Sequence, residues 1–181
     1  MFGRRAAGAA LAAAMCLTWS PTAAQAHTGP EPVVCAGQYR TTWTPGLTLS
    51  TRPTRISTTE TYSCAEGSGK AVKATGRFEG TLPASCLGVN TSPFREVVRF
   101  ADGRESVIEY TSNVRARAGA VSLIKLEGTV IKGHAKGGHA FRTAQLLHTD
   151  LPTACLSPAG LREGMGLAEL YIGPPGEAEP A

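Results

Sequence analysis

Four histidines carry most of the metal-binding potential of this sequence, and His27 has the most specific position. A basic start, a short apolar stretch and a small-x-small sequence ending at Ala26 predict a signal peptide over residues 1–26, cleaved before His27. A terminal histidine would offer an α-amino nitrogen and an imidazole nitrogen, which together can chelate one copper ion. Copper binding at His27 is therefore one alternative function. The competing interpretation is that His27 only follows the cleavage site in a polar lead-in.

His134 and His139 lie in a glycine-rich segment, residues 133–139, which reads as a turn between two strands. Two histidines across such a turn could ligate zinc or copper. His148 cannot join them, because nine residues of extended strand place it about 30 Å from His139. A solvated turn with incidental histidines is the favoured interpretation.

Three aromatic residues, Tyr39, Trp43 and Tyr62, fall on two segments that we expect to be neighbouring strands. A disulfide between these strands would hold the rings rigidly, which favours the binding of a sugar or a peptide on an aromatic surface. The favoured interpretation is that Trp43 belongs to the hydrophobic core or covers one edge of the sandwich.

Catalytic patterns are weak in this chain. It contains no G-x-S-x-G sequence for a nucleophilic serine. Glu96 and Glu109 could be paired as glycosidase carboxylates, but each is equally well explained as half of a charge pair or an edge residue on a hairpin. The sequence favours a non-catalytic protein over an enzyme, with no cofactor apart from the alternative copper ion.

The four cysteines after residue 26 are Cys35, Cys64, Cys86 and Cys155. An even number in an exported chain predicts two disulfides, for which three connectivities exist. The first two lie almost symmetrically about the turn-rich segment 45–53, so a hairpin there would bring them together. The last two follow similar small residues at expected strand ends. We therefore predict the pairs 35–64 and 86–155, and no zinc site, because no C-x-x-C spacing occurs.

Size and charge limit the classes of function. The 155 residues after position 26 suffice for one domain, which we place at residues 27–172. Residues 173–181 form a tail that has nothing to bury and is expected to be disordered. No later segment has the length and hydropathy of a membrane span. The net charge after residue 26 is only +2, with both signs interleaved, which argues against nucleic-acid binding.

The clearest structural element is a β-hairpin over residues 94–110, with an Asp-Gly turn signal. A two-residue loop would place like charges opposite each other, which is unfavourable. A three-residue loop, 101–103, with Gly103 at positive φ, pairs Arg95 with Glu109 instead. The inner face of the hairpin then consists of Phe94, Val98, Phe100, Ile108 and Tyr110.

Alternating polar and apolar residues predict about eight strands in all. They are expected at residues 33–43, 56–64, 71–82, 94–100, 104–110, 118–132, 139–149 and 166–172. Residues 48–55 read as an irregular edge segment, and 158–163 as a possible helical turn. Closely spaced antiparallel strands form a β-sandwich or a β-barrel. We expect a sandwich first, because nothing in the sequence specifies barrel closure.

Several short sequences support a resemblance to a group of known proteins: TPGLT at 44–48, SCL at 85–87, LEGTV at 126–130 and ACL at 154–156. Together they resemble the small secreted, cysteine-containing all-β proteins of actinobacteria. The resemblance implies secretion and the fold class, and it implies no activity.

The sequence thus favours a secreted, extracellular, disulfide-stapled binding domain. Its expected partner is an envelope component, an extracellular protein or a glycan. The alternatives are a copper-binding protein that uses His27 and a structural envelope protein that self-associates.

Overall fold

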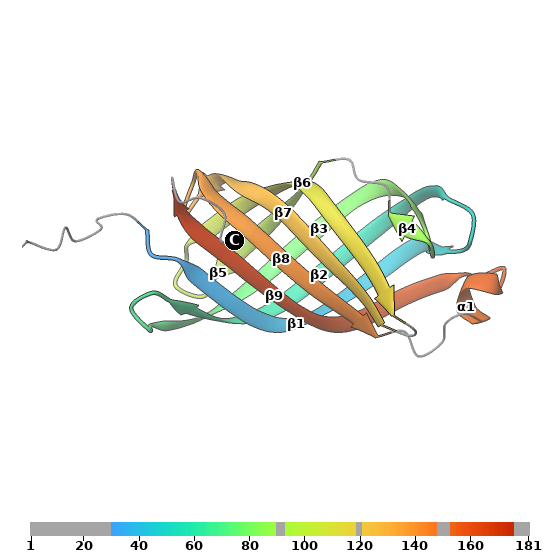
Figure 1. Ribbon diagram of the computed structural model, residues 1–181, viewed down its shortest axis with the longest axis horizontal. Helices are drawn as coiled ribbons and strands as arrows, with labels where there is room; N and C mark the ends of the chain where they lie inside the picture. The colour runs from blue at the N-terminus through green and yellow to red at the C-terminus, as the bar shows by residue number, and fades with distance from the viewer. Residues whose placement is uncertain (1–29, 90–92, 119–120, 148–152, 176–181) are drawn as a thin grey trace, which may run out of the picture.

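The computed structural model describes residues 30–89, 93–118, 121–147 and 153–175, which form nine strands and one short helix (Figure 1). The elements are β1 (Val33–Leu47), β2 (Arg52–Glu66), β3 (Ala71–Ser85), β4 (Gly88–Val89), β5 (Phe94–Phe100), β6 (Glu105–Ala118), β7 (Val121–Gly133), β8 (Gly138–Leu147), α1 (Thr153–Leu156) and β9 (Leu161–Pro175). Within the described residues, no helix is both long enough and apolar enough to cross a membrane.

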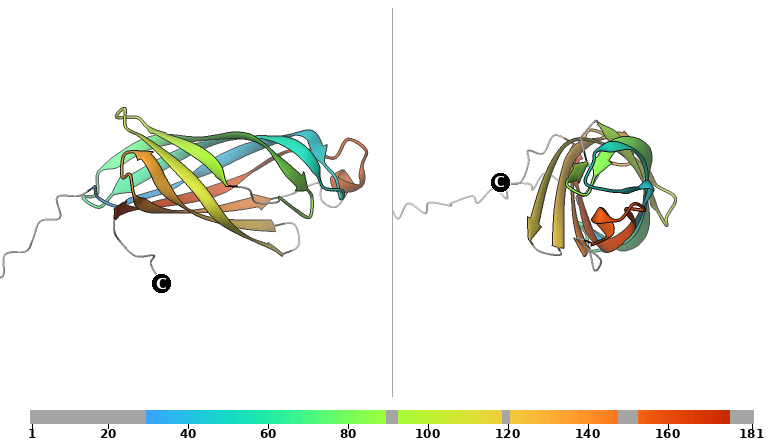
Figure 2. Two further views of the ribbon diagram at one scale, coloured as in Figure 1. Left: turned by 90° about the horizontal axis from the view of Figure 1, so that it is seen from above. Right: turned by 90° about the vertical axis from the view of Figure 1, so that its right-hand side faces the viewer.

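Eight of the strands form a closed antiparallel barrel, visible end-on in Figure 2. Each strand pairs with the next one along the chain, and β9 returns to pair with β1, while β4 pairs only with the end of β3. Of the two expected architectures, the structure is the barrel, which corrects the preference for a sandwich. The physical reason is the β1–β9 ladder: it removes the two free edges that separate sheets would keep.

The strands are longer than the sequence pattern indicated. β1 continues to Leu47, and β2 starts at Arg52, so the expected irregular segment is partly strand. Pro53 is tolerated there because it lies at the second position of β2, where one missing donor disturbs the ladder little. The helical turn lies at α1, before the expected position at residues 158–163. Residues 173–175, which were expected to belong to the disordered tail, extend β9. Residues 176–181 of the expected tail lie outside the described part of the chain.

The β5–β6 hairpin has the predicted register. Arg95 lies opposite Glu109, and Phe94 lies opposite Tyr110. Gly103 has a φ of 90°, and its N–H donates to the Phe100 carbonyl at 3.0 Å, which closes the three-residue loop. The Arg95–Glu109 ion pair has an Nε–Oε1 distance of 2.9 Å. All five residues expected on the inner face are buried or partly buried in the core.

The barrel interior is packed at one end and hollow at the other. At the end where β1 starts and β2 finishes, apolar side chains fill the space between the strands. These buried residues include Val33, Cys35, Cys64, Val72, Val98, Phe100, Ile108, Val130, Ala140 and Ile172. The hollow end is the one that carries β4 and α1.

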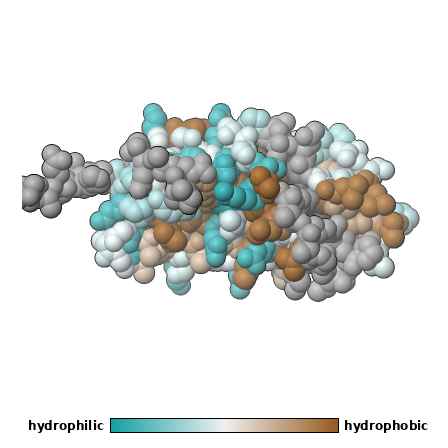
Figure 3. Space-filling view, in the orientation of Figure 1, coloured by the Kyte–Doolittle hydropathy of each residue, from teal (hydrophilic) through white to brown (hydrophobic). Residues whose placement is uncertain are grey.

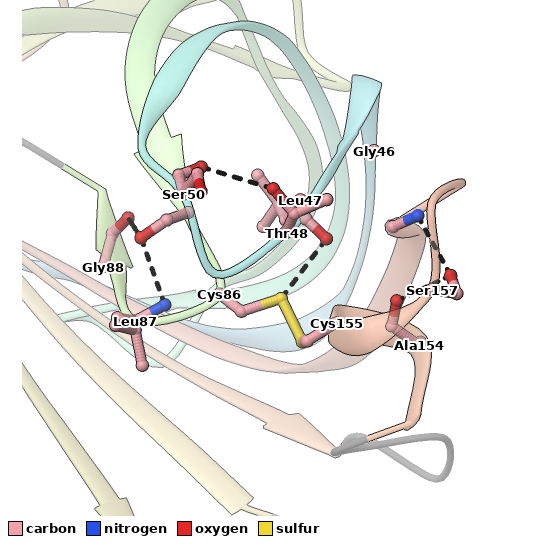
Figure 4. The surroundings of a disulfide bond; sticks show 12 residues. Gly46, Leu47, Thr48, Ser50, Cys86, Leu87, Gly88, Ala154, Cys155 and Ser157 are labelled. Atoms are coloured by element: carbon pink, nitrogen blue, oxygen red, sulfur yellow. Dashed lines mark hydrogen bonds between the residues drawn. A yellow bond between two sulfur atoms is a disulfide. The ribbon is translucent and has the colours of Figure 1, made fainter.

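Both predicted disulfides are present. Cys35 lies directly opposite Cys64 in the β1–β2 ladder, inside the packed end. Cys86, after β3, is joined to Cys155 of α1 at the hollow end (Figure 4). The Cys86 sulfur lies 3.3 Å from the Leu47 carbonyl oxygen, so this bridge also contacts the end of β1. Two disulfides indicate an oxidising environment outside the cytoplasm.

Candidate ligand-binding cavity

A cavity of about 190 Å³ occupies the hollow half of the barrel. Its walls come from seven of the barrel strands and from β4, because the inward side chains there leave space between them. The apolar lining residues are Trp43, Leu47, Ile56, Phe78, Leu82, Leu87, Phe94, Ile124, Leu126, Ala144 and Leu146. Phe78 and Phe94 contact each other, with ring centroids 4.7 Å apart. These walls would exclude polar solutes and accept an apolar molecule.

Leu87 lies at the mouth of this cavity. It contributes to the lining, and yet 71% of its surface is exposed to solvent. Leu156 of α1 is also exposed, at 66%. In Figure 3, hydrophobic residues gather at the end of the molecule where α1 lies. The mouth therefore has an apolar rim.

Three charged side chains form the polar floor of the cavity. They are Glu60 of β2, Glu96 of β5 and Arg142 of β8, and their exposed fractions are 2%, 2% and 8%. Arg142 Nη2 donates to Glu60 Oε1, and its Nε lies 4.0 Å from Glu96 Oε2. The guanidinium also lies over the ring of Tyr39, 5.7 Å from the centroid. The single cation is thus held between two carboxylates and an aromatic face.

Two tyrosines support the carboxylates from below the cavity. The Tyr62 hydroxyl donates to Glu60 Oε2, and the Tyr110 hydroxyl donates to Glu96 Oε2 at 2.9 Å. Burial, followed by the nearby Glu96 charge, raises the pKa of both phenols, so they remain donors at any physiological pH. Each carboxylate is therefore oriented by one tyrosine.

Gly76 of β3 makes room for both carboxylates. A Cβ at this position would lie 2.4 Å from Glu96 Oε1 and 2.5 Å from Glu60 Oε2. The two carboxylates therefore occupy the space that any side chain at residue 76 would need. Strand β3 pairs with both β2 and β5, which places this gap between the two glutamates.

The floor carries more negative than positive charge when both carboxyls are ionised. Arg142 is the only cation among the described residues that line the cavity. Glu96 Oε1 and Arg142 Nε have no hydrogen-bond partner within the described part of the chain. Desolvation raises the pKa of Glu96 to about 7, although the Tyr110 hydrogen bond opposes this shift. Burial lowers the pKa of Arg142 only to about 10, so the guanidinium stays charged at neutral pH.

The predicted aromatic residues lie inside the barrel, not on its surface. Tyr39 and Trp43 line the cavity, with exposed fractions of 5% and 6%. Tyr62 is 2% exposed and lies beneath the floor. This corrects the expected aromatic surface, because positions 39 and 43 of β1 and position 62 of β2 all have the inward parity of the closed barrel.

The predicted metal ligands lie away from the cavity. His134 is half-buried, with Nε2 3.0 Å from Arg104 Nη1 and its ring edge-on to Phe100. His139 is half-buried and packs against Phe141, with ring centroids 4.4 Å apart. No group of three or more His, Cys, Asp or Glu side chains in the described ranges is arranged to hold a metal ion. His27 lies outside those ranges.

Sequence reasoning missed Glu60 and Arg142 and considered Glu96 only as a glycosidase partner of Glu109, so it did not find this three-residue floor. A signal for the floor was present, because the predicted hairpin register places Glu96 between Phe94 and Val98 on the inner face. Glu109 faces outward and pairs with Arg95, so the two glutamates of the hairpin do not share a site. Glu60 and Arg142 likewise lie at the inward parity of β2 and β8.

Comparisons with known proteins add no family to this description. No family model matches the chain, and neither the curated proteins nor the solved structures compared with it give a match. The function is therefore argued from the cavity.

Proposed function

We propose that this protein is a secreted binding protein that holds one small, mainly apolar molecule inside its barrel. The observation that carries the proposal is the cavity itself, with apolar walls above a buried polar floor. The interior of an eight-stranded barrel is just wide enough to be filled by side chains or to hold one small ligand. Here one end is filled by side chains and the other contains the cavity.

The volume sets the size of the ligand. An apolar cavity of about 150 Å³ can hold benzene, so about 190 Å³ suits an aromatic ring with a short chain. Removing apolar surface from water contributes about 25 cal/mol for each Å² buried. The ring of paired strands and two disulfides would keep the site open before binding, which reduces the entropy lost on association.

The first test fills the cavity. Ala144 is buried and lines it, whereas the next residue, Gln145, is exposed on the outer face of β8. The neutral probe 3-phenylpropan-1-ol is titrated calorimetrically into the wild type, Ala144→Phe and Gln145→Phe. We expect Ala144→Phe to lower the affinity about tenfold or more, which corresponds to about 1.4 kcal/mol, and Gln145→Phe to leave it unchanged.

The smaller replacement Ala144→Leu gives the same comparison if the phenylalanine variant does not fold. A wild type that binds no probe would contradict the proposal. Equal losses in the Ala144 and Gln145 variants would place binding elsewhere on the protein.

A further inference from the structure

We propose that the cavity selects an organic monocation, an amine whose apolar body fills the walls and whose ammonium group binds Glu96. This inference rests on the proposed function, because it specifies which molecule the same cavity takes.

The charges of the floor carry the inference. With both carboxyls ionised, Glu60 and Glu96 supply two negative charges and Arg142 one positive charge, so a single cation balances the site. Arg142 donates to Glu60 and only approaches Glu96, at 4.0 Å. Glu96 is therefore the carboxylate that remains to be neutralised. A buried charge is unfavourable unless it is paired and hydrogen-bonded.

The hydrogen bonds lead to the same group. Glu96 Oε2 accepts from Tyr110, while Glu96 Oε1 is buried and accepts no hydrogen bond from the described residues. The charged or titratable groups around this carboxyl are Glu60 and Tyr62 of β2, Tyr110 of β6 and Arg142 of β8. Tyr62 and Arg142 are already directed to Glu60. An ammonium group brings three donors and one positive charge, which is what Glu96 Oε1 lacks.

Other head groups fit less well. An alcohol can donate one hydrogen bond but leaves the negative charge unbalanced. A carboxylate would meet two carboxylates at the floor, where Arg142 Nε is the one charged donor without a hydrogen-bond partner among the described residues. The expected order of affinity is amine, then alcohol, then carboxylate.

The experiment uses three probes with one body: 3-phenylpropylamine, 3-phenylpropan-1-ol and 3-phenylpropanoate. Each is titrated calorimetrically into the wild-type protein at pH 8. At this pH an alkyl amine is protonated, and the Glu96 carboxyl, whose pKa burial raises to about 7, is mostly ionised. We expect the amine to bind about tenfold more tightly than the alcohol, and the carboxylate to bind most weakly.

The variant Glu96→Gln keeps the shape of the side chain and an oxygen that can accept from Tyr110, but it removes the charge. We expect it to bind the amine no more tightly than the alcohol. The matched control is Glu79→Gln, which removes an exposed carboxylate of β3 that pairs with Arg55 outside the barrel. It should retain the full preference for the amine.

The outcomes separate the two proposals. If the alcohol binds as tightly as the amine in the wild type, selectivity for a cation is wrong while the proposed function stands. If none of the three probes binds, both are wrong. If Glu96→Gln retains the preference, Glu96 is not the group that recognises the ammonium. The wild-type series decides the selectivity even if this variant does not fold.

Discussion

Glu96 is a side chain that we expect to lower the stability of the empty barrel and, on the proposal above, to bind the ligand. It lies in the barrel interior between Phe94 and Val98, where an apolar residue would pack better. Its only hydrogen bond among the described residues comes from Tyr110, so burial dominates and the proton is held more tightly than in water. Such a group is unfavourable in the empty barrel and becomes favourable when a donor reaches it.

The pKa of Glu96 predicts a specific dependence of stability on pH. The carboxyl changes from an ordinary pKa of 4.5 in the unfolded chain to about 7 in the folded protein, so the folded state binds the proton more tightly between these values. The contribution of Glu96 is therefore most favourable below pH 4.5, is lost as the pH rises towards 7, and stays lost above it. The loss is on the order of 3 kcal/mol. Glu96→Gln should thus be more stable than the wild type at pH 8, with the difference shrinking towards pH 4.5.

Urea denaturation of both proteins across this pH range measures the difference directly, and other titrating groups cancel in it. The exposed variant Glu79→Gln is the control and should gain no stability at pH 8. A difference between Glu96→Gln and wild type that does not change with pH would contradict the prediction.

At the scale of the strands, the packing constraint that bears on the cavity floor is Gly76 of β3. Its missing side chain leaves space for the carboxylates of Glu60 and Glu96, which approach the position of a Cβ to 2.5 Å and 2.4 Å. Contacts this short force a rearrangement, so Gly76→Ala should destabilise the protein by about 1–3 kcal/mol. It should also weaken binding of the phenylpropyl probes, since both carboxylates must move.

The comparison for Gly76→Ala is Gly88→Ala. A Cβ at Gly88 of β4 would meet nothing within 4 Å, so this variant should be neutral or slightly stabilising. Chemical denaturation of the two variants measures the difference in stability. Equal stabilities of the two would show that the carboxylates do not need the gap.

The strands and their pairing were largely predictable from the sequence, whereas the charged floor was not. Period-two alternation predicts the strands, and the Asp-Gly turn with its charge pairs predicts the β5–β6 register. The near-symmetric positions of Cys35 and Cys64 about the turn-rich segment 45–53 predict the hairpin that places them opposite each other. The alternation rule treats a charged residue as outward-facing, so Glu96 reads as half of a charge pair or as an edge residue even though its parity points inward. Its partners come from β2, β6 and β8, and only barrel closure brings these strands around one point. Closure leaves no local signal, because a sandwich and a barrel have the same alternation.

At the scale of the whole molecule, the two disulfides lie at different ends of the barrel. Cys35–Cys64 lies in the packed end, whereas Cys86–Cys155 holds α1 against the segment after β3, beside the exposed Leu87 of the cavity mouth. The first closes a sequence separation of 29 residues and the second one of 69. The second therefore restrains both a longer stretch of the unfolded chain and the entrance to the cavity.

Replacing Cys86 and Cys155 together by alanine should reduce the free energy of unfolding by about 4 kcal/mol on the chain-entropy estimate. It should also weaken binding of the phenylpropyl probes, because the rim is no longer tethered. Denaturant unfolding and calorimetry measure the two effects. The double alanine variant of Cys35 and Cys64 is the comparison, with a smaller entropic loss and an unchanged cavity. Equal probe affinities in the two double variants would mean that the bridge does not shape the mouth.

The pairing of β9 with β1 makes the molecule a ring of strands. Val33, at the start of β1, lies opposite Ile172, near the end of β9, so the two ends of the barrel sequence meet side by side. A short linker between them, with new ends opened in the exposed turn at 67–69, would leave the ladders of all eight barrel strands in place. Each barrel strand therefore has a paired neighbour on both sides. Because the strand order is cyclic, we expect a circularly permuted chain to form the same barrel.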